Sequence, residues 1–202
     1  MDIVTLRNWD HDFDVLVYEP VRGWDGVIAD EALLRDQCDQ RGAILVADEM
    51  ITGFLRWGPR FMNRAADIVV SGKGLAQGAP LAVIGVKPDL MPHSMPIGWT
   101  TTGGGNNLVS TIGLHVLQHL IKNERPLQDA VHAIHTALQP VCHRGAGALW
   151  FHDCRDPASM RAVFERSRIV ASWHGSVLRL GPRFGIESEL LHQTINLIKE
   201  SA

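Results

Sequence analysis

Two short apolar runs, each leading to a side chain that can do chemistry, constrain the fold of this chain more than any other feature. Residues 43–47 read Ala-Ile-Leu-Val-Ala and end on Asp48, and residues 68–70 read Ile-Val-Val and lead through a glycine-lined turn to Lys73. Short apolar runs bounded by turn signals are typical of strands buried in a parallel sheet. Because polar groups gather at the carboxyl ends of parallel strands, the pattern predicts that this lysine and this carboxylate lie at one sheet edge.

The rest of the chain predicts an α/β fold with a mostly parallel sheet, followed by a smaller α+β domain. Strands are predicted over 15–18, 44–47, 68–70, 82–86, 148–152, 169–171 and 177–180. Helices are predicted over 31–40, 107–122, 126–138, 158–166 and 187–199, and a turn over 145–147 opens the small domain. The predicted domains are part of a large domain at 1–106, connecting helices at 107–140 and a C-terminal small domain at 141–202.

A lysine and a carboxylate at neighbouring strand ends suit pyridoxal 5′-phosphate. The lysine forms a Schiff base with the cofactor, and the carboxylate pairs with the pyridinium nitrogen, so that the ring accepts electrons released at the substrate α-carbon. Taken singly, each residue has an ordinary explanation. A lysine in a glycine-rich loop is often a solvated turn residue, and an aspartate after a strand is often a turn former.

Three further motifs accompany Lys73. Residues 19–23 read Glu-Pro-Val-Arg-Gly, residues 48–54 read Asp-Glu-Met-Ile-Thr-Gly-Phe, and residues 100–106 read Thr-Thr-Thr-Gly-Gly-Gly-Asn. In this order and spacing they resemble the class III (ornithine- and 4-aminobutyrate-type) aminotransferases and the related glutamate-1-semialdehyde aminomutases. The resemblance runs through nearly the whole chain and implies the C-terminal half of the aspartate-aminotransferase fold, fold type I.

The resemblance implies a role for each matching residue. Lys73 matches the lysine that forms the Schiff base, and Asp48 matches the carboxylate that pairs with the pyridinium nitrogen. Met50 matches the apolar residue packed against the pyridine ring, and Thr102 matches the threonine that reaches the cofactor phosphate of the neighbouring active site. Arg179 matches the arginine that holds the substrate carboxylate through a planar fork.

The chain departs from the family pattern at three places. Ile51 replaces a glutamine that often contacts the phenolic oxygen of the cofactor, and Arg183 replaces the second proline of a usual Pro-Pro pair. Many members carry a glutamate after the Glu-Pro-x-x-Gly segment that shields the carboxylate-binding arginine, whereas this chain has Trp24 and Asp25. Trp24 is either an apolar wall of the substrate pocket or a packed surface aromatic.

The chain has 202 residues, about half the length of the family. The family's N-terminal half, with its phosphate-binding turn and its ring-stacking aromatic residue, has no counterpart. A truncated fragment, a pseudo-enzyme and one subunit of a split enzyme all fit this observation. We favour the split enzyme, with a complementary chain that supplies the N-terminal half and two such heterodimers forming a heterotetramer.

The implied reaction is transfer of an amino group from a small-molecule donor to a carbonyl acceptor. The motifs leave an aminomutase open, as well as a non-catalytic regulatory or scaffold subunit of the same fold. The net charge of −3 gives no reason to expect nucleic acid or an anionic membrane as a partner. Three widely spaced cysteines and the lack of an N-terminal signal segment favour a cytoplasmic protein, and the histidine spacings predict no metal site.

Overall fold

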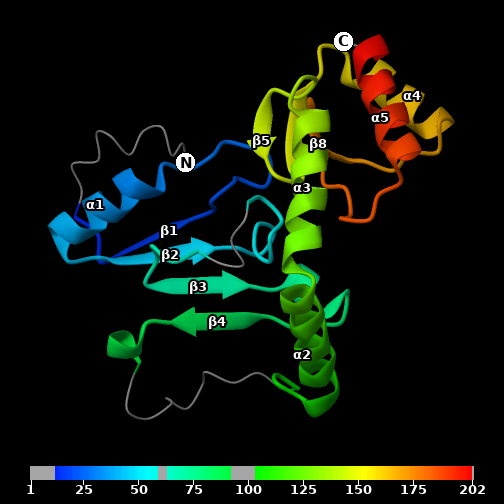
Figure 1. Ribbon diagram of the computed structural model, residues 1–202. Helices are drawn as coiled ribbons and strands as arrows, with labels where there is room; N and C mark the ends of the chain where they lie inside the picture. The colour runs from blue at the N-terminus through cyan, green and yellow to red at the C-terminus, as the bar shows by residue number, and fades with distance from the viewer. Residues whose placement is uncertain (1–11, 59–62, 92–102, 202) are drawn as a thin grey trace. The chain divides into compact units, whose positions relative to one another are not determined.

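The computed structural model describes residues 12–58, 63–91 and 103–201 (Figure 1). The chain packs as two compact units. The first unit contains Met1–Pro20, Ala29–Gly53 and Met62–His119, and the second contains Val21–Ile28, Phe54–Phe61 and Leu120–Ala202. Two short segments therefore leave the first unit and pack within the second. The domain bounds at 106 and 140 stay a prediction.

The first unit is built on a four-stranded sheet with the order β1-β2-β3-β4. The first three strands run parallel, and β4 is antiparallel to β3. The strands are β1 (Val15–Tyr18), β2 (Ile44–Asp48), β3 (Ile68–Ser71) and β4 (Val83–Val86). The helices are α1 (Glu31–Arg41), the 3-10 turns η2 (Lys73–Ala76) and η3 (Pro88–Leu90), and α2 (Asn107–Lys122), whose last residues belong to the second unit.

Helix α1 covers one face of this sheet. Asp30 caps its first turn by accepting a hydrogen bond of 3.1 Å from the Leu33 amide, and Gly42 ends it in the left-handed region at φ 64°. Leu34 and Cys38, four residues apart, lie on the same helix face and are buried. They pack on a core that includes Leu16, Tyr18, Ala29, Ala43, Leu45, Ala47, Ala66 and Val69.

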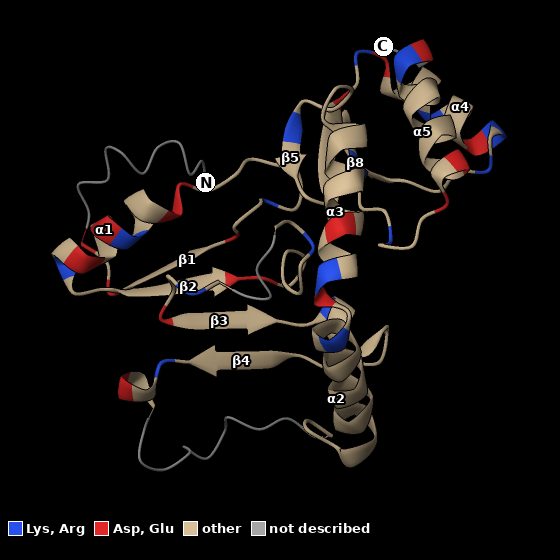
Figure 2. Cartoon of the chain, viewed as in Figure 1, with Lys and Arg blue, Asp and Glu red and all other residues tan. Residues whose placement is uncertain are grey.

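The opposite face of the sheet is apolar and open. Val17 is 62 % exposed and Ile84 is 66 % exposed, although both lie on strands. Figure 2 shows no charged residue within β1, β3 or β4, and β2 carries an acidic residue only at its end. Parallel sheets are normally covered on both faces. The apolar composition of this face is that of such a covered surface. Strand alternation and register place these residues on it: Val15, Val17, Ile44, Val46, Asp48, Ile68, Val70, Ile84 and Val86.

One half-buried carboxylate, that of Asp67, links helix α1 to the strands of the first unit. Asp67 accepts hydrogen bonds of 2.7 Å from Arg35 and from Lys87, and of 2.8 Å from the Leu45 amide. Burial alone would raise the pKa of Asp67, but these hydrogen bonds and charges outweigh it and lower that pKa to about 2. Asp67 is therefore ionised wherever the unit is folded above that pH.

The second unit contains an antiparallel sheet with the order β5-β6-β8-β7. Its strands are β5 (Arg144–Ala146), β6 (Leu149–Asp153), β7 (Ser172–His174) and β8 (Val177–Leu180). Its helices are α3 (Glu124–Leu138), α4 (Pro157–Arg166) and α5 (Ser188–Ser201). All three helices pack on one face, around a core that includes Val131, Ile134, Trp150, Met160, Phe164, Leu178, Leu180 and Ile195.

The segment Val21–Ile28 covers the other face of this sheet. It forms a small hairpin closed by an antiparallel bridge between its end residues. Gly26, at φ 77°, lies so close to the buried Phe151 ring that a β-carbon there would be 2.2 Å from a ring carbon. Arg144 donates to the Asp25 carbonyl at 2.6 Å, and Arg179 donates to the Gly23 carbonyl at 2.8 Å. The hairpin is thus held by sterics and by two arginines of the sheet.

Apart from two places, the predicted strands and helices are confirmed, and none of their ends shifts by more than two residues. The strand predicted over 169–171 is wrong, because the ladder begins at Ser172. Arg168 turns the chain at φ 57° after α4, and Val170 is 99 % exposed. The β-branched residues Ile169 and Val170 favour a strand by themselves, but they lie outside the ladder that β7 forms with β8. The turn predicted over 145–147 is wrong at its start, since Arg144–Ala146 pairs with β6.

No helix in the described ranges is both long and apolar enough to cross a membrane.

Candidate active site

The ends of β2 and β3 bring Asp48 and the approach to Lys73 side by side. Asp48 is paired in register with Val70 on the parallel neighbour, and the Glu49 amide donates to the Val70 carbonyl at 2.8 Å. Lys73 follows three residues after Val70, at the first position of η2. The backbone therefore carries Asp48 and Lys73 at the same edge of the sheet, as the sequence predicts.

Asp48 offers a carboxylate oxygen that the protein does not use. Its Oδ1 accepts a hydrogen bond of 3.0 Å from the Met50 amide, which fixes the side chain in an aspartate turn at the strand end. Among residues 12–58, 63–91 and 103–201, no group bonds Oδ2 and no cation pairs with Asp48. A half-buried carboxylate with one oriented free oxygen is suited to accept a hydrogen bond from a protonated ring nitrogen.

Lys73 is held in an uncommon backbone conformation. Its φ is 34°, in the left-handed region that residues with a side chain seldom adopt. Its side chain is exposed, and within the described ranges it makes no hydrogen bond or ion pair. Strain of this kind costs about 1–3 kcal/mol and is concentrated at functional sites. The strained backbone and the unpaired amine together single out Lys73 among the lysines described.

Met50 lies against Gly72, the residue before Lys73. A β-carbon built on Gly72 would be 2.8 Å from the Met50 methyl carbon and 3.0 Å from its sulfur, so the thioether lies directly against the Gly72 backbone. The glycine thus leaves room for an apolar side chain next to the lysine. This placement of Met50 agrees with an apolar contact to the pyridine ring of the cofactor, and that role of Met50 stays a prediction.

A buried polar network holds the turn that carries Asp48, and the sequence did not single it out. Glu49 is 2 % exposed, and its carboxylate accepts a hydrogen bond of 2.7 Å from the Asn63 amide. Its carbonyl accepts bonds from the Gly53 amide at 3.0 Å and from the Ser71 hydroxyl at 3.2 Å. The available signal was Glu49 itself, an acidic residue directly after Asp48 at the end of an apolar strand. A carboxylate buried there needs several hydrogen-bond donors around it.

The same network reaches β1. Asn63 donates to the Tyr18 hydroxyl at 2.8 Å and also to Glu31, and Tyr18 donates to Glu31 at 3.2 Å. Burial, followed by the charge of Glu31, raises the pKa of Tyr18 well above its usual value. The tyrosine therefore stays a neutral donor at any pH at which the protein works.

Arg179 and Trp24 belong to the second unit. Arg179 donates to the Gly23 carbonyl at 2.8 Å and to the Ser172 hydroxyl at 3.1 Å. Trp24 is 53 % exposed, and the Arg22 guanidinium lies 5.2 Å from the centre of its ring. Both interpretations of Trp24 remain open, since a half-exposed ring packed on an arginine can be a surface aromatic or a pocket wall.

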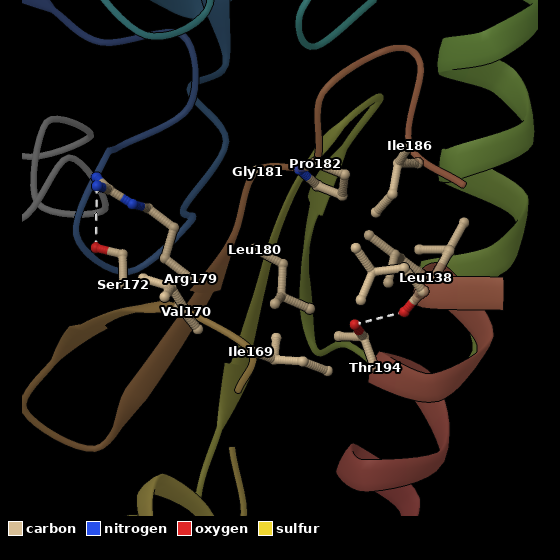
Figure 3. Close-up of a pocket in the computed structure, with 13 residues that line it drawn as sticks. Leu138, Ile169, Val170, Ser172, Arg179, Leu180, Gly181, Pro182, Ile186 and Thr194 are labelled. Carbon is tan, nitrogen blue, oxygen red and sulfur yellow. Dashed lines mark hydrogen bonds between the residues drawn. The ribbon is translucent and has the colours of Figure 1, made fainter. Parts of the chain in front are cut away.

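A cavity of about 500 Å³ opens beside β8 in the second unit. Figure 3 shows that the Arg179 guanidinium points away from it, toward Ser172, while Leu180 and Ile169 point into it. Thr194, at the far side, spends its hydroxyl on the Leu190 carbonyl at 2.8 Å. The cavity is therefore an apolar space on the helix-covered side, and the arginine serves the other side of the sheet.

The predicted residues thus fall into two groups. Lys73, Asp48 and Met50 lie together in the first unit, and Arg179 and Trp24 lie together in the second. Thr102 lies outside the described residues.

The family model described as "Aminotransferase class-III" matches residues 3–201. The chain belongs to the class III aminotransferases. Enzymes of this family depend on pyridoxal 5′-phosphate.

Individual relatives agree with this assignment. The chain is 29 % identical, over 92 % of its length and 50 % of the relative's, to a mitochondrial acetylornithine aminotransferase of Yarrowia lipolytica. It is 33 % identical, over 56 % of its length and 28 % of the relative's, to a glutamate-1-semialdehyde 2,1-aminomutase of Chlorobium phaeovibrioides. The chain spans about half the length of the first of these relatives and less of the second.

Solved structures show the same fold. The ornithine δ-aminotransferase of Plasmodium falciparum superposes with a TM-score of 0.79 at 23 % identity, over 92 % of this chain and 53 % of that one. An amine transaminase from an uncultivated Pseudomonas species gives a TM-score of 0.79 at 21 % identity, over 93 % and 51 %. The chain therefore has the α/β architecture of fold type I enzymes, of which it spans about half.

The residues of the first unit fit pyridoxal 5′-phosphate chemically. The cofactor needs an amine for covalent attachment, an anion for its ring nitrogen and an apolar surface for its ring. Lys73 has an unused amine, Asp48 has an unused oxygen, and Met50 presents a thioether beside them. These are the residues that would hold the ring end of the cofactor.

Proposed function

We propose that this chain is the subunit of a split class III aminotransferase that carries the catalytic lysine. It transfers an amino group between an amine or amino acid and a carbonyl acceptor. The observation that carries this proposal is the pair of unused groups, Lys73 Nζ and Asp48 Oδ2, at the ends of adjacent parallel strands in a chain of this family.

Each residue has a chemical task in this proposal. When bound, pyridoxal 5′-phosphate supplies an electron sink for the charge that develops at the substrate α-carbon. Asp48 holds a proton at the ring nitrogen of the cofactor. Lys73 anchors the cofactor through Nζ, and the same amine, once released, takes the proton from the substrate α-carbon. Met50 keeps water from one face of the ring, and Arg179 orients the substrate through its carboxylate.

An aminomutase is a second candidate. The 33 % identity to a glutamate-1-semialdehyde 2,1-aminomutase supports it, as does the Met50-Ile51 pair where many aminotransferases have Val-Gln. A non-catalytic scaffold subunit of the same fold would need neither the unpaired lysine nor its strained backbone.

We propose further that a complementary chain supplies the N-terminal half of the fold. The open apolar face of the first unit supports this, because nine strand residues there have the composition of a buried layer and Asp48 lies among them. Covering this face would also shield the site from water. We expect two such heterodimers to form a heterotetramer, with Thr102 serving the neighbouring site, in the cytoplasm.

Borohydride reduction of the cofactor-loaded assembly tests the proposed function. The reduced cofactor should be found on the peptide that contains Lys73, and Lys73→Ala should lose both label and turnover. Lys122→Ala, an exposed lysine at the end of α2, is the matched control and should keep both. Asp48→Asn should keep the label but lose about 100-fold or more in turnover, the scale of one preorganised electrostatic contact. A label on Lys87, Lys122 or Lys199 would contradict the assignment.

Size-exclusion chromatography with light scattering tests the partner. The singly expressed chain should self-associate and bind the cofactor weakly, whereas the chain co-expressed with its complement should be yellow, active and of defined mass. A stable and active assembly of this chain by itself would refute the split-enzyme proposal.

A further inference from the structure

Ser71, the last residue of β3, carries a buried hydroxyl two residues before Lys73. The residue is completely buried, and its hydroxyl donates a hydrogen bond of 3.2 Å to the Glu49 carbonyl. Glu49 is the residue directly after Asp48. One side-chain hydrogen bond therefore joins the end of the strand that carries Asp48 to the end of the strand that leads to Lys73.

This bond continues the ladder between β2 and β3 beyond its paired residues. The two strands pair as far as Asp48 and Val70, and the Glu49 amide then donates to the Val70 carbonyl at 2.8 Å. The Ser71 hydroxyl binds the carbonyl of the same Glu49. Both backbone polar groups of Glu49 are thus bound to β3, so β3 fixes the position of the residue next to Asp48.

Ser71 is itself held in place and shielded from water. Its backbone pairs with Val83 on the antiparallel neighbour β4. Strand alternation places its side chain on the same face as that of Val69, which belongs to the core under α1, whereas Asp48 lies on the opposite face with Val70. A hydrogen bond in such a dry environment is electrostatically stronger than one in water.

Gly53 leaves the room that this hydroxyl needs. A β-carbon built on Gly53 would lie 2.6 Å from Ser71 Oγ and 3.1 Å from the Glu49 carbonyl oxygen. The Gly53 amide also donates to that carbonyl, at 3.0 Å. The turn after Asp48 therefore closes directly on the Ser71 hydroxyl, and a side chain at position 53 would displace it.

A second buried hydroxyl in the same turn provides a contrast. Thr52 is also completely buried, but among residues 12–58, 63–91 and 103–201 its Oγ1 has no hydrogen-bond partner. Removing the Thr52 hydroxyl would break no bond, whereas removing that of Ser71 would release the Glu49 carbonyl from β3. The two residues differ in the one contact of interest.

We propose that Ser71 is a positioning residue: its hydroxyl fixes the spacing between Asp48 and Lys73 at which both reach the same cofactor ring. The inference rests on the proposed function, in which Lys73 is bonded to the cofactor and Asp48 holds a proton at its ring nitrogen. The ring is rigid and cannot follow a change in this spacing. Because the lysine end is covalent, the Asp48 contact is the one that weakens when the strand ends separate.

The pH titration of the visible absorbance of the Lys73 Schiff base tests this role on the cofactor-loaded assembly. A protonated ring nitrogen repels the proton of the Schiff base, so a weaker Asp48 contact lets the Schiff base keep its proton to a higher pH. Ser71→Ala should therefore raise the titration midpoint by about 0.4–1 pH unit, the equivalent of one hydrogen bond. Thr52→Val, the matched control, should leave the midpoint unchanged.

Two further variants test whether Ser71 acts through Asp48. Asp48→Asn should raise the midpoint more than Ser71→Ala does, and adding Ser71→Ala to it should have no further effect, because the positioned contact is already lost. Gly53→Ala displaces the hydroxyl instead of removing it and should reproduce the rise. In turnover, Ser71→Ala should lower kcat about 2- to 10-fold and leave KM within about 2-fold, since its side chain contacts no substrate.

The outcomes separate this role from the proposed function. A purely structural role of Ser71 would lower the free energy of unfolding but leave the midpoint and kcat per bound cofactor unchanged, which would overturn the proposal. Equal shifts for Ser71→Ala and Thr52→Val, or additive shifts with Asp48→Asn, would overturn it as well. Each of these results leaves the aminotransferase function in place. Absence of a Schiff base on Lys73 would refute the proposed function, and with it the role of Ser71.

Discussion

Gly26→Ala tests the close contact that fixes the hairpin on the second sheet. Two costs add at this position. The φ of 77° is left-handed, which costs a residue with a β-carbon about 1–2 kcal/mol. The new β-carbon would also lie 2.2 Å from one ring carbon of Phe151 and 2.9 Å from its β-carbon. Phe151 is completely buried, so relief requires moving the hairpin, and overpacking of this kind costs about 1–3 kcal/mol.

We therefore expect Gly26→Ala to lower the free energy of unfolding by about 2–5 kcal/mol. Gly175→Ala is the matched control in the same unit, because Gly175 has a φ of 59° and no residue other than its two chain neighbours comes within 4 Å of the position that its new β-carbon would take. It should lose only the conformational part, about 1–2 kcal/mol. Urea unfolding of the assembled protein, followed by circular dichroism, measures both values.

A second variant separates crowding from backbone strain. Phe151→Leu removes ring atoms that the new β-carbon would meet, so Gly26→Ala should cost less in that background than in the unaltered protein. The difference is the coupling energy of the two sites. The carboxylate affinity of Gly26→Ala should also fall, because a displaced hairpin moves the Gly23 carbonyl away from Arg179. Equal losses for Gly26→Ala and Gly175→Ala, with no coupling to Phe151, would refute the steric argument.

Two further predictions concern the first unit. Asp67 has a folded pKa of about 2 against an ordinary value of 3.8, so its ionised form stabilises the fold above about pH 4, and that contribution is lost as the pH falls toward 2. Asp67→Asn should remove on the order of 1–2 kcal/mol at about pH 7 after allowance for solvent screening, and should flatten the acid limb of stability against pH measured by urea unfolding. Val17→Asp places a charge on the open apolar face and should prevent assembly with the complementary chain in size-exclusion chromatography. The matched control Val170→Asp, at a fully exposed position of the second unit, should assemble normally, and equal behaviour of the two variants would count against the open face as the contact surface.

The candidate site was predictable where the chemistry follows from local sequence. Asp48 and Lys73 each follow an apolar run, and parallel pairing alone brings the ends of such runs to one edge. The strained φ of Lys73 was not predictable, because it depends on how η2 leaves β3. Glu49 was missed for a related reason. Its role depends on donors from Asn63, 14 residues away, and on a burial that no local pattern reports.

The sequence by itself determined most strands and helices, the order of the elements and the identity of the groups at the sheet edge. Apolar periodicity and turn residues act over a few positions, and these features depend on nothing longer. The tertiary structure decided which charged side chains form ion pairs and which donate to neutral groups instead. The sequence does not show which of Arg22, Arg144 and Arg179 form ion pairs, and in the folded chain Arg22 pairs with Asp25 and Arg144 with Asp153, whereas Arg179 donates to a carbonyl. The strand at Ser172–His174 was decided in the same way, because a ladder forms where a neighbouring strand offers its hydrogen bonds. Charge pairing and strand pairing join residues far apart in the chain, so their outcome is fixed only when the chain is folded.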